Sequence, residues 1–495
     1  MVNSTTVREK KFEQLLSESG EVGYVVRTEQ CVAEIEGLPG VKISEMVIFE
    51  TGQLGEVTAL KEGSVEVLLL SREGLVMGTR AVRTGSGLVV SVGTHMLGHT
   101  IDVAGAIVSG KAKTSDDARE MKIDVMPRGI VGRKKIGRQL NTGVMMIDLM
   151  IPLGLGQREL VMGDRKTGKS YILWQLLINQ VKMGGIAIYA AIGKKKTEIA
   201  RTEEFFRSLG VLENMIIVAA SSMDSVGQVY LCPYTAMAAA EYFRDAGRDV
   251  LLILDDMSTH AKFYRELSLI SRKFPGRDSY PGDIFHIHSK LLERGGDYVV
   301  KKPDGTETEA AITVIPVVET VQGDVTGYIQ TNLMSMTDGH IYFDLDLFFK
   351  GRRPSINPFI SVTRVGHQTQ SELGRDASRT LYDLFNSYER TGQFLRFGAE
   401  LGENSRQILA MGDKILAFFD QRGYSVVPIN VTYLGVALLL SGMWDGMNLE
   451  KLVSAYGSQE QVRRSVDDVV SKATTLTQLL DVVRRDPQPF LQQMK

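Results

Sequence analysis

The stretch that decides the fold class of this chain is Gly163-Asp164-Arg165-Lys166-Thr167-Gly168-Lys169-Ser170. It fits the phosphate-loop pattern G-x-x-x-x-G-K-[ST], between an apolar run at residues 159–162 and a helix-like stretch at residues 171–181. A strand, a glycine loop and a helix in this order direct backbone N–H groups at phosphate oxygens. In such a loop Lys169 reaches the terminal phosphates and the hydroxyl of Ser170 ligates Mg²⁺. These flanks favour a nucleotide-binding α/β domain over an ordinary glycine-rich turn.

The composition is typical of a globular protein with several domains. At 495 residues the chain is too long for one hydrophobic core, so about two to four domains are expected. The formal net charge of -2 provides no electrostatic reason to expect nucleic acid or an anionic membrane as a partner. Two cysteines, Cys31 and Cys232, are too few for a disulfide framework or a metal cluster, which suits a reducing compartment. His286 and His288 alternate along one possible strand face without a third ligand nearby in sequence, which favours a structural role.

Neither a membrane span nor a leader is apparent in the sequence. No apolar run approaches the roughly 18 residues needed to cross a bilayer. Residues 1–11 lack an apolar signal core and an Arg-rich transit pattern. We therefore expect a soluble, unprocessed chain, which still allows docking onto a membrane complex through other subunits.

The hydrophobic patterning divides the chain into a helix and three domains. A short charged helix is expected at residues 1–18, a small β-barrel or sandwich at 19–86, an α/β nucleotide-binding domain at 87–370, and a helical bundle at 371–495. The expected strands of the first domain are 22–27, 32–36, 45–49, 56–60 and 64–70. Those of the second are 160–162, 186–192, 215–219 and 250–254, with a hairpin of 298–302 and 309–318 around the turn 303–305. The expected helices of the last domain are 381–393, 404–421 and 449–456.

Two further segments complete the predicted nucleotide site. Asp255 follows the buried strand 250–254, where a carboxylate holds the Mg²⁺ shell through a metal-bound water. Lys194 follows the strand 186–192, where a chain that hydrolysed ATP by itself would need a carboxylate to activate water. A protonated amine cannot accept that proton. The nearest carboxylate, Glu198, comes four residues later, and we expect it to lie on a helix with its charge in solvent.

Over nearly its whole length, the chain resembles the alpha subunit of F-type ATP synthases, the nucleotide-binding but non-catalytic member of an alternating hexamer. Besides the phosphate loop, the matching segments are 275–283 (PGRDSYPGD), 288–294, 319–324 (ETVQGD), 337–339, 351–357 (GRRPSIN) and 361–366 (SVTRVG). The resemblance implies a β-barrel crown, a RecA-like P-loop domain with a parallel sheet, and a C-terminal helical bundle. It also implies bound ATP or ADP with Mg²⁺.

The resemblance assigns roles to residues outside the phosphate loop. Arg364 matches the arginine that reaches into the neighbouring catalytic site, an effect worth about 10³–10⁵ in rate for arginine fingers in general. Arg353 and Pro354 match contacts near the adenine and ribose. Gln421 matches one adenine-side glutamine, whereas Gly423 stands where the family has a second.

Besides Gly423, three positions depart from the family pattern. Lys194 stands where alpha subunits usually carry glutamine and catalytic beta subunits carry glutamate. This lysine keeps the site non-hydrolytic and adds a cation that is expected to change nucleotide retention. Lys166 replaces a common glutamine, and Ser170 replaces threonine but keeps the hydroxyl.

The implied partners are three catalytic beta subunits that alternate with three copies of this chain, a central-shaft gamma subunit, and a peripheral-stalk subunit at the N-terminus. The expected location is peripheral, on the cytoplasmic face of a bacterial membrane, with membrane contact only through the membrane sector. A rival interpretation is a self-sufficient homohexameric ATPase of the type III secretion and flagellar export kind. A third is a paralogue that serves as an interaction scaffold.

Overall fold

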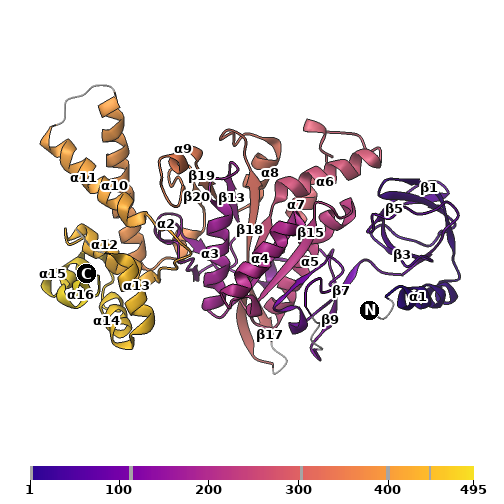
Figure 1. Cartoon of the computed structure of the whole chain (residues 1–495), viewed down its shortest axis with the longest axis horizontal. Helices are drawn as coiled ribbons and strands as arrows, with labels where there is room; N and C mark the ends of the chain where they lie inside the picture. Colours follow the sequence, from indigo (N-terminus) through magenta and orange to yellow (C-terminus); the bar gives the residue numbers. More distant parts are fainter. Residues whose placement is uncertain (1–3, 111–114, 302–304, 397–401, 445–447, 495) are drawn as a thin grey trace. The chain divides into compact units, whose positions relative to one another are not determined.

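The computed structural model of the chain describes residues 4–110, 115–301, 305–396, 402–444 and 448–494 (Figure 1). These residues form two compact units. Unit 1 contains residues 1–134, 184–318 and 326–336, and unit 2 contains residues 135–183, 319–325 and 337–495. The strands of the central domain are divided between both units, so each unit is described by itself.

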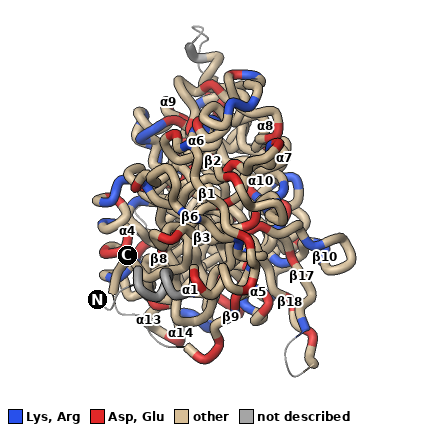
Figure 2. The backbone as a smooth tube through the Cα atoms, turned by 90° about the vertical axis from the view of Figure 1, so that its right-hand side faces the viewer, with Lys and Arg blue, Asp and Glu red and all other residues tan. Residues whose placement is uncertain are grey.

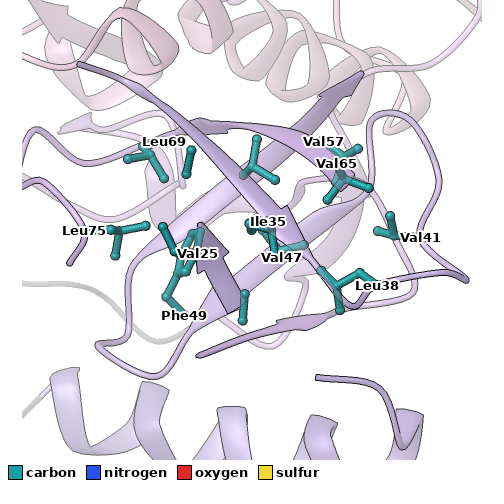
Figure 3. Packing of buried hydrophobic residues seen from close by; sticks show 13 residues of the cluster. Val25, Ile35, Leu38, Val41, Val47, Phe49, Val57, Val65, Leu69 and Leu75 are labelled. Atoms are coloured by element: carbon teal, nitrogen blue, oxygen red, sulfur yellow. The ribbon is translucent and has the colours of Figure 1, made fainter. Parts of the chain in front are cut away.

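Unit 1 begins with a helix, α1 (Ser4–Ser19), and a closed six-stranded barrel in the order β1-β2-β5-β4-β3-β6. The strands are β1 (Gly23–Glu29), β2 (Val32–Glu36), β3 (Met46–Phe49), β4 (Leu54–Leu60), β5 (Ser64–Leu69) and β6 (Arg80–Arg83). The apolar residues of the strands fill the barrel interior, as Figure 3 shows for Val25, Ile35, Val47 and Phe49. The sequence left a barrel or a sandwich open, and the structure is a barrel.

The second part of unit 1 is a parallel sheet in the order β18-β16-β14-β15-β8. Its strands are β8 (His99–Ile101), β14 (Ile186–Lys194), β15 (Met215–Ser221), β16 (Val250–Asp255) and β18 (Glu307–Glu319). The predicted hairpin is present, since β17 (Gly296–Lys301) pairs antiparallel with β18 and β10 (Arg133–Lys134) pairs with β17. Part of its predicted turn, residues 302–304, lies outside the described residues. A small separate sheet joins β7 (Val89–Val92) to β9 (Arg119–Lys122).

Besides α1, the α-helices of unit 1 are α4 (Lys196–Ser208), α5 (Val226–Asp245), α6 (Met257–Ile270), α7 (Ile284–Leu292) and α8 (Tyr328–Met336). The expectation of a strand around His286 and His288 is wrong, because both residues lie on α7. Ile284, His288, Leu291 and Leu292 are its buried residues, and their spacing is that of one helix face.

Unit 2 carries the phosphate loop on a three-stranded sheet in the order β20-β19-β13. The strands are β13 (Glu159–Gly163), β19 (Gly339–Phe343) and β20 (Val362–Thr363), and β13 runs parallel to β19. Short pieces are α2 (Met145–Met150), β11 (Gln139–Leu140), β12 (Leu153–Gly154) and α9 (Leu345–Phe349). The helix that follows the phosphate loop is α3 (Lys169–Lys182).

The C-terminal part of unit 2 is helical, as the sequence predicts. Its helices are α10 (Glu372–Arg396), α11 (Glu403–Phe419), α12 (Ile429–Leu440), α13 (Leu449–Ser458), α14 (Glu460–Ser471), α15 (Leu476–Arg485) and α16 (Gln488–Met494). The three helices expected from periodicity correspond to α10, α11 and α13. The predicted fold class is therefore confirmed, whereas the exact domain boundaries stay predictions.

Charges of both signs are distributed along the backbone, and Figure 2 shows blue and red segments interspersed in its view. This distribution agrees with the nearly equal numbers of 57 basic and 59 acidic residues. Among the described residues, no helix has the length and apolar character that crossing a membrane requires.

Candidate functional site

The phosphate loop in unit 2 joins the end of β13 to the start of α3. Gly163 has φ 152° and Gly168 has φ 90°, a region of backbone conformation that favours glycine. At Gly163 a side chain is also excluded by space, because a Cβ atom there would lie 2.5 Å from the carbonyl oxygen of Phe343. The pattern glycines thus set the path of a loop whose end is a helix N-terminus, the geometry that binds phosphate groups.

The ammonium group of Lys169 is held within this loop. Its Nζ donates to the carbonyl oxygens of Gly163 at 2.7 Å and Asp164 at 2.6 Å, and the side chain is buried. The hydroxyl of Thr167 donates to the same Asp164 carbonyl at 2.8 Å. Ser170, in the first turn of α3, is exposed. The loop therefore presents a fixed cation and an accessible hydroxyl next to each other in sequence.

Two predicted loop residues use their side chains to fasten the loop to residues 319–325. The carboxylate of Asp164 accepts hydrogen bonds from the hydroxyl of Thr320 and from the backbone N–H of Gly323, the latter at 3.0 Å. Nε of Arg165 lies 2.9 Å from Oε2 of Glu319. Lys166 is exposed with φ 64°. These contacts of Asp164 and Arg165 fix the loop against residues 319–325.

A cavity of about 410 Å³ adjoins the phosphate loop within unit 2. Its lining comes from the phosphate loop and α3, the segment around α9, and the loop after α11: Thr167, Gly168, Tyr171, Ile172, Phe343, Phe348, Gly351, Arg353, Pro354, Ser355, Gln421, Arg422 and Gly423. Aromatic and apolar side chains beside a phosphate-binding loop are suited to a nucleoside. The structure therefore brings Arg353, Pro354 and Gln421 together with Thr167 and Gly168 of the phosphate loop, and their contacts with a nucleotide stay a prediction.

The side chain of Arg353 is held in the cavity lining by a ring contact and two hydrogen bonds. The centre of its guanidinium lies 3.7 Å from the centre of the Phe348 ring, and Nη1 donates to the carbonyl oxygens of Phe348 at 2.9 Å and Arg352 at 2.7 Å. On the facing segments, the rings of Tyr171 and Tyr424 stack with centres 4.4 Å apart. The cavity lining thus includes the aromatic rings of Tyr171, Phe343 and Phe348.

Both polar atoms of the Gln421 side chain form hydrogen bonds with backbone groups around it. Its Nε2 donates to the carbonyl oxygens of Gly143 at 2.7 Å and Ser425 at 2.6 Å, and its Oε1 accepts from the N–H of Met145 at 3.1 Å. The backbone N–H of Gln421 donates to the carbonyl of Arg353 at 2.8 Å. In this arrangement the amide shapes the cavity and does not point its donors at a base.

Arg364 lies at the end of β20 and is exposed. Its backbone N–H donates to the carbonyl of Asp338 at 2.9 Å, and Nη1 lies 3.4 Å from the carbonyl of Thr337. It does not belong to the lining of the cavity described above. The guanidinium is thus presented at the surface of unit 2.

In unit 1, the carboxylate of Asp255 at the end of β16 is already paired. Its Oδ1 lies 2.8 Å from Nζ of Lys194, at the end of β14, and its Oδ2 accepts from the hydroxyl of Tyr189 at 2.6 Å. Burial by itself lowers the pKa of Lys194, but the carboxylates of Asp255 and Asp256 outweigh it and hold that pKa above its ordinary value. Burial, and then the charge of Asp255, raise the pKa of Tyr189 well above its usual range. Lys194 is therefore held as an ammonium at hydrogen-bond distance from Asp255.

These contacts bear on how well the residues suit a nucleotide and Mg²⁺. The loop and cavity suit a nucleotide, and the exposed hydroxyl of Ser170 suits a metal ligand. Asp255 fits less well, because its negative charge is neutralised by Lys194 and both oxygens accept hydrogen bonds from protein donors. No group of three or more His, Cys, Asp or Glu side chains placed to hold a metal occurs in the part of the chain that the structure describes.

Sequence reasoning missed several side chains of these sites. Tyr189 lies in the middle of an apolar strand, and there the sequence does not indicate that its hydroxyl will form a hydrogen bond with a carboxylate. Tyr171 and Phe348 lie beside the phosphate loop and near Arg353, yet a single aromatic residue after a loop does not indicate which ring it will face. Only the position of Tyr171 directly after Ser170 could have drawn attention to it.

Comparison with known proteins gives one consistent result. Residues 143–363 match the family described as "ATP synthase alpha/beta family, nucleotide-binding domain". The ATP synthase subunit alpha of Helicobacter acinonychis (strain Sheeba) is 38% identical over 452 residues, which cover 91% of this chain and 89% of that protein. The subunit alpha of Helicobacter pylori (strain P12) has the same identity and coverage. That of Ehrlichia chaffeensis (strain ATCC CRL-10679 / Arkansas) is 35% identical over 443 residues, covering 88% of this chain and 86% of that protein.

Proposed function

Because the chain belongs to the family of ATP synthase alpha subunits, we propose that it is the non-catalytic, nucleotide-binding subunit of a rotary ATP synthase. It binds ATP or ADP through the phosphate loop and the adjoining cavity, with Mg²⁺ bound by Ser170. In the complex it contributes to ATP synthesis or hydrolysis coupled to ion movement. The assembly meets the membrane through its membrane sector, on the cytoplasmic face of a bacterial membrane.

The observation that carries the non-catalytic role is the ion pair of Lys194 with Asp255. A chain that hydrolyses ATP needs a base to orient and deprotonate water, and a lysine that is held protonated by a carboxylate 2.8 Å away cannot serve. Glu198, the nearest carboxylate in sequence, is exposed on α4. This chemistry argues against the self-sufficient export-type ATPase, and the family relationship argues against it independently.

The exposed position of Arg364 supports a role in a neighbouring chain. Arg364 is exposed and lies outside the cavity of its own unit, with its Nη1 at one backbone carbonyl, that of Thr337, so the side chain can be reached by an adjacent subunit. There it would stabilise the charge on the transferred phosphoryl group of the catalytic beta subunit. The further partners in this proposal are three alternating beta subunits, the central-shaft gamma subunit and a peripheral-stalk subunit at the N-terminus.

The decisive experiment measures ATP hydrolysis by the purified chain alone and mixed with a matching catalytic beta chain. We expect no turnover by the chain alone and turnover by the mixture. Arg364→Ala should lower the turnover of the mixture by about 10³-fold, because an arginine finger supplies roughly that factor. Lys169→Ala should instead weaken nucleotide binding to the isolated chain, while much of the mixture's turnover remains.

The matched control is Arg464→Ala, whose side chain is 78% exposed, forms an ion pair with Glu460 on α14 and lies outside the cavity lining. Turnover by the chain alone would overturn the non-catalytic role and make Glu198 the candidate general base. Parental turnover by the Arg364→Ala mixture would refute the role of this arginine in the neighbouring site. Unchanged nucleotide binding by Lys169→Ala would refute the assignment of the phosphate loop.

A further inference from the structure

The hydroxyl groups that line the cavity beside the phosphate loop offer little that would distinguish one base from another. The hydroxyl of Thr167 donates to the carbonyl oxygen of Asp164 at 2.8 Å, and that of Ser355 donates to the carbonyl oxygen of Thr167 at 2.7 Å. Oη of Tyr171 is buried and has no hydrogen-bond partner among the described residues. A phenolic hydroxyl both donates and accepts, so it suits an amino group and a keto oxygen equally.

The longer polar side chains of the lining are also engaged within unit 2. An amide selects a base by pairing its oxygen and its NH₂ group with the base edge. Oε1 of Gln421, however, accepts from the N–H of Met145, and Nε2 donates to two backbone carbonyls. Arg422 is 70% exposed and forms an ion pair with Asp420. The guanidinium of Arg353 only donates, and N7 is an acceptor in adenine and guanine alike, so a bond to N7 does not separate the two purines.

The lining also has room on its glycine sides. A Cβ atom added at Gly351 would meet no heavy atom within 4 Å besides those of its neighbours in the chain, and one at Gly423 would meet only Oη of Tyr171, at 3.9 Å. Guanine exceeds adenine by one exocyclic group, an amino group at C2. An apolar pocket rejects a ligand with one additional polar group only weakly. The two glycines therefore add no steric barrier against the larger purine.

We propose that this cavity takes purine nucleotides without reading the hydrogen-bonding edge of the base, so that guanine nucleotides bind as tightly as adenine nucleotides. The inference rests on the proposed nucleotide binding and widens its class of ligand. Strong selection between two bases arises where the wrong base leaves a polar group of the site unpaired. The amide of Gln421 and the hydroxyls of Thr167 and Ser355 keep their protein partners with either purine. The rings of Phe343 and Phe348 offer apolar area to both bases.

The test is a calorimetric titration of the full-length chain, freed of nucleotide, with ATP, GTP and CTP at one Mg²⁺ concentration. We expect dissociation constants for ATP and GTP that agree within about threefold. CTP should bind about fivefold or more weakly than ATP, because its single ring buries less apolar area in the cavity.

Phe348→Ala removes one ring of the lining and should weaken the binding of ATP and GTP by the same factor, about three- to tenfold. Phe394→Ala is the matched control, because this side chain is 66% exposed on α10 and lies outside the lining. It should bind both nucleotides like the parent. The parent titration decides the inference even if the Phe348→Ala variant does not fold.

The outcomes separate this inference from the proposed function. If the parent binds ATP about tenfold or more tightly than GTP, the cavity reads the base edge; the inference is overturned and nucleotide binding stands. If CTP binds as tightly as ATP, the base does not occupy the cavity, and the inference fails while binding through the phosphate loop stands. If the parent binds none of the three nucleotides, the proposed function and the inference fall together.

Discussion

Acidification is expected to destabilise the region around α6 and α7, because two histidines are buried there in their neutral form. His260 and His288 are 0% and 1% exposed, and Nδ1 of His260 lies 3.1 Å from Nε2 of His288. Nε2 of His260 lies 3.0 Å from the carbonyl oxygen of Tyr230. Since a carbonyl only accepts, this nitrogen carries the hydrogen, and Nδ1 of His260 must accept from His288. Nδ1 of His288 is buried with no hydrogen-bond partner among the described residues, so a proton there would be an unpaired buried donor.

The size of the effect follows from the pKa values. Burial lowers the pKa of His260 from 6.5 to about 4, and burial together with His260 lowers the pKa of His288 well below its ordinary value. The unfolded chain therefore takes up these protons first, so stability is complete above about pH 7 and falls as the pH drops below about 6.5. At about pH 5 one such ring lowers the free energy of unfolding by about 2 kcal/mol relative to about pH 8.

The assay is urea unfolding followed by circular dichroism at both pH values. His260→Gln and His288→Gln each replace one ring by an amide that stays neutral, so each variant should lose about 2 kcal/mol less than the parent between the two pH values. His286→Gln, which removes an exposed histidine from the same helix, should lose as much as the parent. If all four proteins lose the same free energy, the two rings do not remain neutral in the folded protein and the reasoning fails.

Two further changes test the phosphate loop and the cavity. Gly163→Ala would put a Cβ atom 2.5 Å from the carbonyl oxygen of Phe343 at φ 152°, and should cost about 1–3 kcal/mol in urea unfolding and weaken ATP binding. A variant with parental stability and affinity would contradict the close approach of these strands. Gln421→Ala should cost about 1–3 kcal/mol, because it removes the acceptor of the Met145 N–H and one of the two donors to the Gly143 carbonyl, and calorimetry should show weaker ATP binding. An unchanged affinity would mean that this amide does not shape the cavity.

The fold could be predicted where the pattern of apolar residues was strong. The barrel strand β2 has the predicted bounds, because its apolar residues lie between clear breaks in the pattern. The strand β6 escaped notice, since only Ala81 and Val82 are buried between two arginines. The alternation of His286 and His288 suggested a strand. The buried residues of α7 have helical spacing over the whole segment, and this longer pattern, which two histidines do not show, determines the secondary structure.

The site could be predicted as far as local motifs extend. The phosphate loop is a contiguous pattern, and Lys194 and Asp255 follow recognisable strands. The bond between Tyr189 and Asp255 could not be predicted, because it depends on the register of β14 and β16, in which Ala191 lies opposite Asp255. Tyr189 is two residues earlier on the same strand and so shares the face of Ala191. The engaged amide of Gln421 likewise depends on segments more than 270 residues apart.

The cavity beside the phosphate loop has a consequence for the order of events during biosynthesis. Tyr171, on one side of the cavity, is synthesised about 250 residues before Gln421 and Gly423, which line it from the loop after α11. At roughly 5–20 residues per second, the nascent chain carries an incomplete nucleoside cavity for about 10–50 s. During that interval the apolar side of Tyr171 and Ile172 lacks its C-terminal cover. Nucleotide therefore cannot assist the early folding of the phosphate loop through this cavity, and full affinity is expected only in chains translated past the loop after α11.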